Sequence, residues 1–140
     1  MIVKRKRFIS LLITAVCMFL FAMPAFAAIK ASSQISQYDM SVTPVTNTLN
    51  IKFLISGNHI MDKIGCESIY VYEKSGSHWI LVNSWYEDDS GMSRSNTRSS
   101  RNTMYSDSEA GVEYKVVMTV FAEDSNGRDT RTRTIYVTGR

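Results

Sequence analysis

The side chains best suited to chemistry are one cysteine and two histidines, Cys66, His59 and His78. A neighbouring imidazole can activate a thiol as a nucleophile, and imidazoles and thiolates together can hold zinc. His59 lies seven residues before Cys66 across an expected turn, but no third orienting group accompanies the pair. No His-x-x-His or Glu-x-x-His spacing occurs. The sequence therefore predicts a protein that is not an enzyme and has no catalytic residues, bound metal or cofactor. A secreted hydrolase is the distant alternative.

Two acidic segments offer oxygen ligands of the kind that calcium prefers. They are Glu87-Asp88-Asp89 and the stretch from Asp124 to Asp129. Calcium requires several oxygens on a loop that wraps the ion. Neither segment has the twelve-residue helix-loop-helix spacing, and Arg128 interrupts the second. Because Asn126-Gly127 is foremost a tight-turn signal, calcium binding is a minor alternative.

The first 27 residues have the three parts of a secretory signal peptide. Residues 4–7 are four consecutive cations, residues 8–26 are almost entirely apolar, and Ala25-Phe26-Ala27 follows Pro24 as a small-x-small cleavage pattern. We predict cleavage after Ala27 and a secreted, extracellular product that does not span a membrane. An uncleaved anchor is the alternative, because the apolar run is near the ~20 residues that span a bilayer.

Removal of residues 1–27 leaves 113 residues, which suffice for one domain. All thirteen acids and twelve of the sixteen Lys and Arg residues then remain, so the net charge becomes −1. The basic isoelectric point thus belongs to the precursor, and we expect no nucleic-acid partner. Cys66 becomes the only cysteine. This excludes an internal disulfide and favours a buried thiol over an intermolecular bridge.

The rest of the chain reads as short strands separated by turns. We expect a flexible lead-in over residues 28–37 and one all-β domain over residues 38–140, without internal repeats. The apolar–polar alternation and the turn residues predict strands at 38–43, 49–56, 69–72, 78–85, 114–122 and 129–137, with a short strand at 104–105. Gly57-Asn58 is expected to end the second of these strands. Residues 87–102 have almost no apolar content and predict a surface loop or mobile edge.

Period-two alternation also predicts which side chains face the core. The inward set is Leu49, Ile51, Phe53, Ile55, Ile69, Val71, Tyr114, Val116, Met118, Val120, Ala122, Ile135 and Val137. About seven strands in roughly 100 residues, joined by hairpins, are typical of an antiparallel β-sandwich.

Residues 111–122, Gly-Val-Glu-Tyr-Lys-Val-Val-Met-Thr-Val-Phe-Ala, resemble the sixth strand of a fibronectin type III domain. The resemblance implies an immunoglobulin-like sandwich in which the hydroxyl of Tyr114 bonds back to upstream backbone. It also implies that Val116, Val120 and Ala122 fill the core. The whole sequence further resembles small exported proteins of Gram-positive gut bacteria, a likeness that carries no function.

The same alternation predicts a shared outer face on three neighbouring strands. Its apolar members are Tyr70, Tyr72, Val117, Phe121 and Tyr136. A patch of this size usually marks an interaction surface. We therefore expect a secreted, non-enzymatic binding or adhesion module whose partner is a protein or a glycan. The alternatives are a structural, self-associating homo-oligomer, and a patch that is covered by loop 87–102 or by the lead-in.

Overall fold

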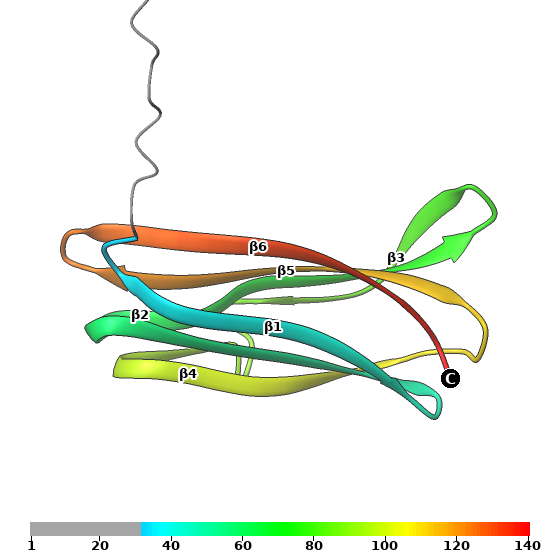
Figure 1. Cartoon of the computed structure of the whole chain (residues 1–140), viewed down its shortest axis with the longest axis horizontal. Helices are drawn as coiled ribbons and strands as arrows, with labels where there is room; N and C mark the ends of the chain where they lie inside the picture. The colour runs from blue at the N-terminus through cyan, green and yellow to red at the C-terminus, as the bar shows by residue number, and fades with distance from the viewer. Residues whose placement is uncertain (1–31) are drawn as a thin grey trace, which may run out of the picture. The chain divides into compact units, whose positions relative to one another are not determined.

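The computed structural model describes residues 32–140; the predicted signal peptide, residues 1–27, lies outside them. Six strands follow one another along the chain (Figure 1). They are β1 (Ile35–Val45), β2 (Thr48–Ser75), β3 (His78–Tyr86), β4 (Ser93–Asp107), β5 (Glu113–Asp124) and β6 (Gly127–Thr138). All pairings are antiparallel. Within residues 32–140 no helix is long and apolar enough to cross a membrane.

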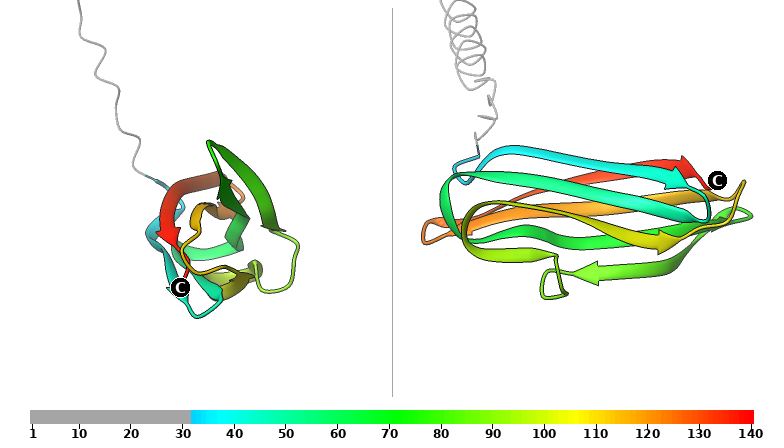
Figure 2. Two further views of the ribbon diagram at one scale, coloured as in Figure 1. Left: turned by 90° about the vertical axis from the view of Figure 1, so that its right-hand side faces the viewer. Right: turned by 90° about the horizontal axis from the view of Figure 1, so that it is seen from below.

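The long strand β2 lies at the centre of both halves of the sheet. Its residues 48–56 pair with β1 on one side and β4 on the other. Its residues 68–73 pair with β3 and with β5, and β6 pairs with the far side of β5. The sheet curls between these halves, so that they face each other across the core (Figure 2).

The continuity of β2 corrects two predictions. Gly57-Asn58 does not end a strand, because the amide of Asn58 donates to the carbonyl of Gln34 at 2.9 Å and Gly57 still pairs with Ile35. The two strands expected at 49–56 and 69–72 are therefore parts of one bent strand. Residues 32–140 consequently contain six strands instead of the expected seven or so.

The N-terminal boundary of the sheet also differs from the prediction. β1 begins at Ile35, so the last three residues of the expected lead-in 28–37 belong to a strand. Hydrogen bonds hold the preceding residues against the β5–β6 hairpin. The hydroxyl of Ser32 donates to Asp129 at 2.5 Å, and the side-chain amide of Gln34 donates to Asp124 at 3.1 Å.

Residues 93–102, predicted to be part of a loop, are the first ten residues of β4. The polar composition misled the prediction, because the ladder to β2 uses backbone groups, which every residue possesses. The inward positions of β4 include the small buried side chains of Ser100 and Ser106. A strand of this composition is stable as an edge, where only one side needs a partner. Within the described residues β4 pairs with β2 alone.

The two predicted hairpins are confirmed. β2 ends at Ser75 and β3 begins at His78, with Gly76 in the left-handed region at φ 61°. β5 and β6 meet across Ser125-Asn126, where the amide of Asn126 donates to the carboxylate of Asp124 at 2.8 Å.

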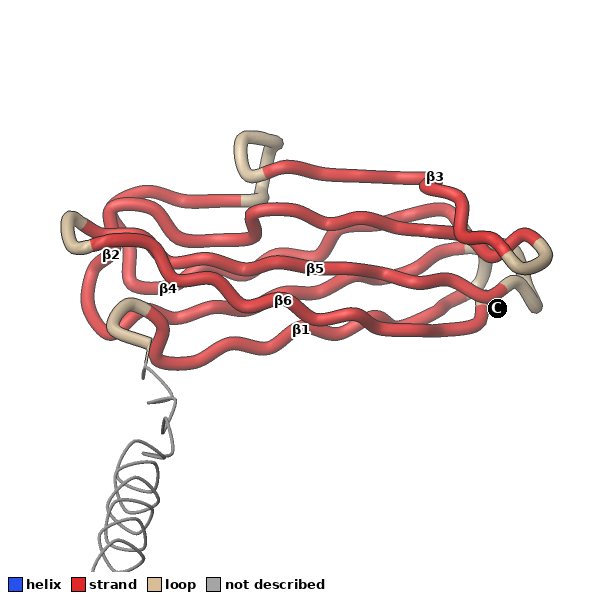
Figure 3. The backbone as a smooth tube through the Cα atoms, turned by 90° about the horizontal axis from the view of Figure 1, so that it is seen from above, coloured by secondary structure: helices blue, strands red, loops and turns tan. Residues whose placement is uncertain are grey.

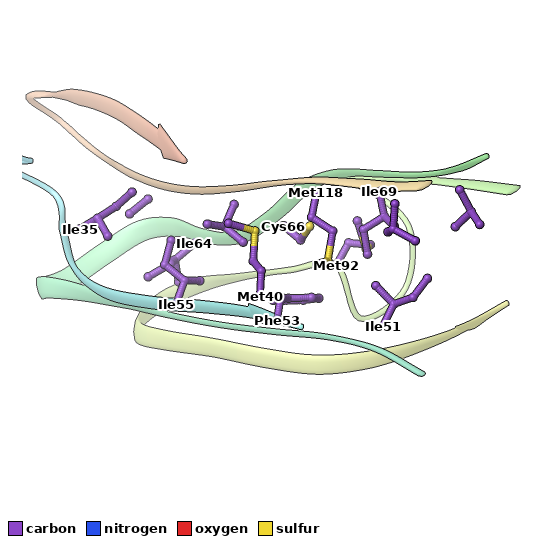
Figure 4. Packing of buried hydrophobic residues seen from close by; sticks show 14 of the residues in the cluster. Ile35, Met40, Ile51, Phe53, Ile55, Ile64, Cys66, Ile69, Met92 and Met118 are labelled. Carbon is purple, nitrogen blue, oxygen red and sulfur yellow. The ribbon is translucent and has the colours of Figure 1, made fainter. Parts of the chain in front are cut away.

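The core lies between the two halves of the sheet (Figure 4). Every residue predicted to face inward from β2 and β5 is buried, and Ile135 and Val137 are partly buried against the core. Met40, from β1, and Met92, from the β3–β4 connection, complete the core beyond the prediction. Because all these side chains lie between residues 35 and 137, the described part carries a complete core of its own.

Tyr114 is buried at the start of β5, and its hydroxyl oxygen accepts a hydrogen bond from the amide of Glu109 at 2.9 Å. The predicted bond to upstream backbone is thus confirmed. Burial also raises the pKa of the Tyr114 phenol above its usual value. The bond fastens the β4–β5 connection to the strand that follows it.

We expect Tyr114→Phe in residues 28–140 to lower the free energy of unfolding by about 1 kcal/mol, because the Glu109 amide loses its partner. Urea unfolding followed by circular dichroism measures the change. Tyr105→Phe is the matched control, since Tyr105 is exposed on β4. Equal losses in the two variants would show that the buried hydrogen bond contributes nothing.

Candidate functional site: an aromatic sheet face

Four of the five residues predicted for an outer patch lie together on one face of the β3–β2–β5–β6 half. The ladder places Tyr72 opposite Lys115 and Lys115 opposite Tyr136. In the adjacent row, Tyr70 lies opposite Val117. Since alternate residues of a strand share a face, these side chains project from the same side of the sheet. Tyr136 is 64% exposed. The side chains of Tyr70, Tyr72, Lys115 and Val117 are partly buried.

Trp79 of β3 joins this group, although the sequence analysis did not include it. Its ring lies 5.7 Å from that of Tyr136, centroid to centroid. The register explains its position, because the two-residue turn sets Lys74 opposite Trp79 and thereby on the same side as Tyr72. A two-residue turn assigned from the sequence would have placed Trp79 on this face. The aromatic face is hereafter Tyr70, Tyr72, Trp79, Lys115, Val117 and Tyr136.

A lysine is held among the rings of the aromatic face. The Lys115 ammonium lies 4.4 Å from the ring centroid of Tyr72 and 5.2 Å from that of Trp79. Cation–π attraction of this kind holds the long side chain against the rings. The surface therefore combines aromatic area with a fixed positive charge.

Phe121, the fifth predicted residue, faces the same side of the sheet but is fully buried. The Arg128 guanidinium lies 3.7 Å from the centre of its ring. The prediction that Phe121 belongs to an exposed patch is therefore wrong. Sequence alternation gave its side of the sheet correctly but did not reveal the covering arginine.

Three carboxylates hold Arg128 over Phe121. The guanidinium pairs with Glu123 at 3.0 Å, with Glu67 at 3.2 Å and with Glu87. The bonds from Arg128 and Lys63 lower the pKa of Glu87 below its usual value. The Arg128 cluster, which we define as Arg128, Glu67, Glu87, Glu123 and Lys63, thus fastens the β3–β4 connection to the sheet.

Cys66 and the histidines do not form a catalytic pair in the structure. Cys66 is buried, as predicted, and its thiol donates weak hydrogen bonds to the carbonyls of Ser68 and Thr119. Burial raises its pKa to about 12. His59 instead pairs with Asp124, with Nε2 2.9 Å from the carboxylate. The thiol is therefore protonated and enclosed at neutral pH.

The acidic segments are engaged in other contacts. Within residues 32–140 no group of three or more His, Cys, Asp or Glu side chains is arranged to hold a metal. Asp88 bonds to Lys63 at 3.0 Å, and the carboxylate of Asp89 accepts a bond from the amide of Tyr86. Asp124 has a lowered pKa, chiefly because Gln34 donates to it.

A separate hollow of about 550 Å³ lies on the other half of the sheet, over β1, β2 and β4. Lys52, Leu54, Arg101 and Tyr105 are among its lining residues. None of the predicted patch residues reaches it. Tyr105 is as exposed as Tyr136, at 64%, so it offers a matched control for substitutions in the aromatic face.

No protein-family model matches the sequence, and no curated protein matches it. The proposed function therefore rests on the sequence, the fold and the arrangement of the side chains.

We expect Arg128→Gln to lower the free energy of unfolding by about 1–2 kcal/mol at pH 7. Glu67 and Glu123 would lose their cation, Glu87 would keep only Lys63, and the ring of Phe121 would be uncovered. Urea unfolding measures the loss, and Arg94→Gln, exposed on β4, is the control.

The lowered pKa of Glu87 sets the pH dependence of this loss. Its contribution to stability is present above its ordinary pKa of 4.5 and disappears as the pH falls through the lower native value. The difference between Arg128→Gln and the native sequence should therefore shrink below pH 4.5. A difference that is constant from pH 7 to pH 3 would contradict this role of Glu87.

Cys66 should resist a thiol reagent at pH 8 in the native protein and react completely in denaturant, because its raised pKa and burial keep the thiolate unformed. The absorbance of the chromophore that the thiol reagent releases measures the extent of the reaction. Rapid labelling of the folded protein would contradict the enclosed position of the thiol.

Proposed function

We propose that this chain is an exported, non-enzymatic binding module that docks a protein partner on its aromatic face. The single observation that carries the proposal is the cross-strand row Tyr72–Lys115–Tyr136, with Trp79 packed against both Tyr136 and Lys115. Aromatic residues are enriched at protein interfaces and supply large area with little loss of conformational entropy.

A fibronectin type III-like fold is part of the proposal. When the two halves of β2 are counted separately, seven strand segments form two facing layers, which supports an immunoglobulin-like arrangement. The hydrogen bond from the Glu109 amide to Tyr114 supports it further, because such domains fasten the corner before this strand with a tyrosine. Domains of this architecture commonly serve as recognition modules of cell surfaces.

Export is supported by the sequence of residues 1–27, which combines a basic start, an apolar run and a small-residue cleavage pattern. A secreted domain with one enclosed thiol, Cys66, has no need of a disulfide framework when its core is complete. The partner is then expected outside the cell.

The geometry favours a protein over a glycan as the partner. Sugars bind by stacking on open ring faces, but the Lys115 ammonium lies over the rings of Tyr72 and Trp79. The surface next to them is apolar, since Leu81 lies opposite Tyr72 and is 49% exposed. A flat, mixed surface with a fixed cation suits a protein that offers apolar side chains and a carboxylate.

The test uses residues 28–140 as bait for a displayed random-peptide library and, in parallel, for insoluble polysaccharides such as chitin and peptidoglycan. We expect peptides whose binding falls at least tenfold in Tyr72→Ser/Tyr136→Ser, because anchor residues of interfaces contribute most of the affinity. Tyr105→Ser should bind them normally.

Each other outcome contradicts part of the proposal. Polysaccharide binding that the double variant abolishes would identify the partner as a glycan. Peptides that bind the double variant equally well would remove the aromatic face from the binding surface. Circular dichroism of each variant checks that the fold is intact.

A further inference from the structure

The tip of the β2–β3 hairpin exposes three consecutive apolar residues. Ile80, Leu81 and Val82 are 52%, 49% and 47% exposed. Ile80 and Leu81 lie in the regular ladder with β2 and face opposite sides of the strand, so apolar surface lies on both sides of the tip. A run of this kind on a soluble domain indicates an interaction surface or an aggregation hazard.

The backbone edge of the same segment is open. β3 lies at the border of the sheet and within residues 32–140 pairs only with β2 (Figure 3). At the other end of β3 the edge is capped, because Asn83 accepts from the amide of Ser84 and Asp89 accepts from that of Tyr86. Among the described residues no such cap reaches residues 78–82. Their outward N–H and C=O groups are therefore available to another strand.

The other borders of the sheet are protected against strand addition. β4 carries Arg94, Arg98 and Arg101, and charged side chains on an edge discourage pairing. β1 and β6 lie near each other, and Arg133 of β6 donates to the carbonyl of Met40 in β1 at 2.8 Å. β3, by contrast, contains no Asp, Glu, Lys or Arg from His78 to Tyr86.

We propose that a second copy of this chain pairs with this edge, so that residues 78–82 of two molecules form an antiparallel ladder about a two-fold axis. An uncharged strand can lie against its own copy without like charges meeting. Pairing of β3 with a different edge of the next molecule would build open fibres, and the arginines of β4 oppose it. The self-pairing closes at two copies.

The dimer has a direct consequence for the aromatic face. A two-fold axis relating edge strands in one ladder stands perpendicular to the sheet, so both copies present the same face to the same side. Trp79 lies on the paired strand itself. The two aromatic faces thereby become one continuous, bivalent surface.

Sedimentation equilibrium of residues 28–140 tests the pairing from about 1 µM to 1 mM. We expect the mass to rise from one chain to two. Ile80→Lys, which places like charges beside the axis, should weaken the association at least tenfold. Ile60→Lys is the matched control, because Ile60 is 66% exposed on β2 away from the hairpin. Amide exchange of residues 78–82 should slow as the protein concentration rises.

A monomer at every concentration overturns the proposal, as does equal association of Ile80→Lys and the native sequence. If Tyr136→Ser dissociates the dimer and Ile80→Lys does not, the interface is the aromatic face and not the β3 edge. A dimer that selects no peptides refutes the proposed docking function alone. A monomer that selects them refutes the pairing alone.

Discussion

The bend of β2 is the constraint on which the rest of the structure depends. β2 pairs with four of the other five strands, so its change of direction turns one sheet into two facing halves. Between its two halves β2 approaches the β3–β4 connection closely at Gly65, where a side-chain carbon would lie 2.2 Å from the carbonyl oxygen of Met92. The amide of Cys66 donates to that same oxygen at 2.7 Å. The β3–β4 connection is thus fastened beside the bend, and Met92 enters the core there.

The outer surface of β5 divides into two parts with different chemistry. Towards the β5–β6 turn, Arg128 and its three carboxylates cover Phe121 and withdraw that ring from solvent. Towards the other end, Lys115 lies among rings that stay partly exposed. In the first part the charges are already paired within the chain, which leaves few unpaired groups for a partner. The second part retains apolar area and one cation. The proposed docking surface therefore lies at the end of the sheet that carries the β2–β3 hairpin.

Local patterns predicted the elements whose side chains alternate between core and solvent. The inward sets of β2 and β5 and both hairpins were correct because burial imposes a period of two. Edges and bends were not predictable in the same way. β4 forms through backbone pairing that polar residues allow, and the continuity of β2 through Gly57 depends on a contact with Ile35 that is distant in sequence. The same limit explains Phe121, since the residue that covers it, Arg128, belongs to another strand.

The proposed docking face and the proposed pairing edge share residues of the β2–β3 hairpin. Trp79 belongs to the aromatic face and to the open edge. Leu81, on the same strand as Trp79, lies opposite Tyr72 of β2. A strand added along residues 78–82 would fix the backbone that positions Trp79, and through it the contacts with Tyr136 and Lys115. Since less side-chain freedom would then be lost on docking, the proposed pairing at the edge would favour the proposed binding at the face. Reciprocity requires that a partner on the face also favour pairing at the edge.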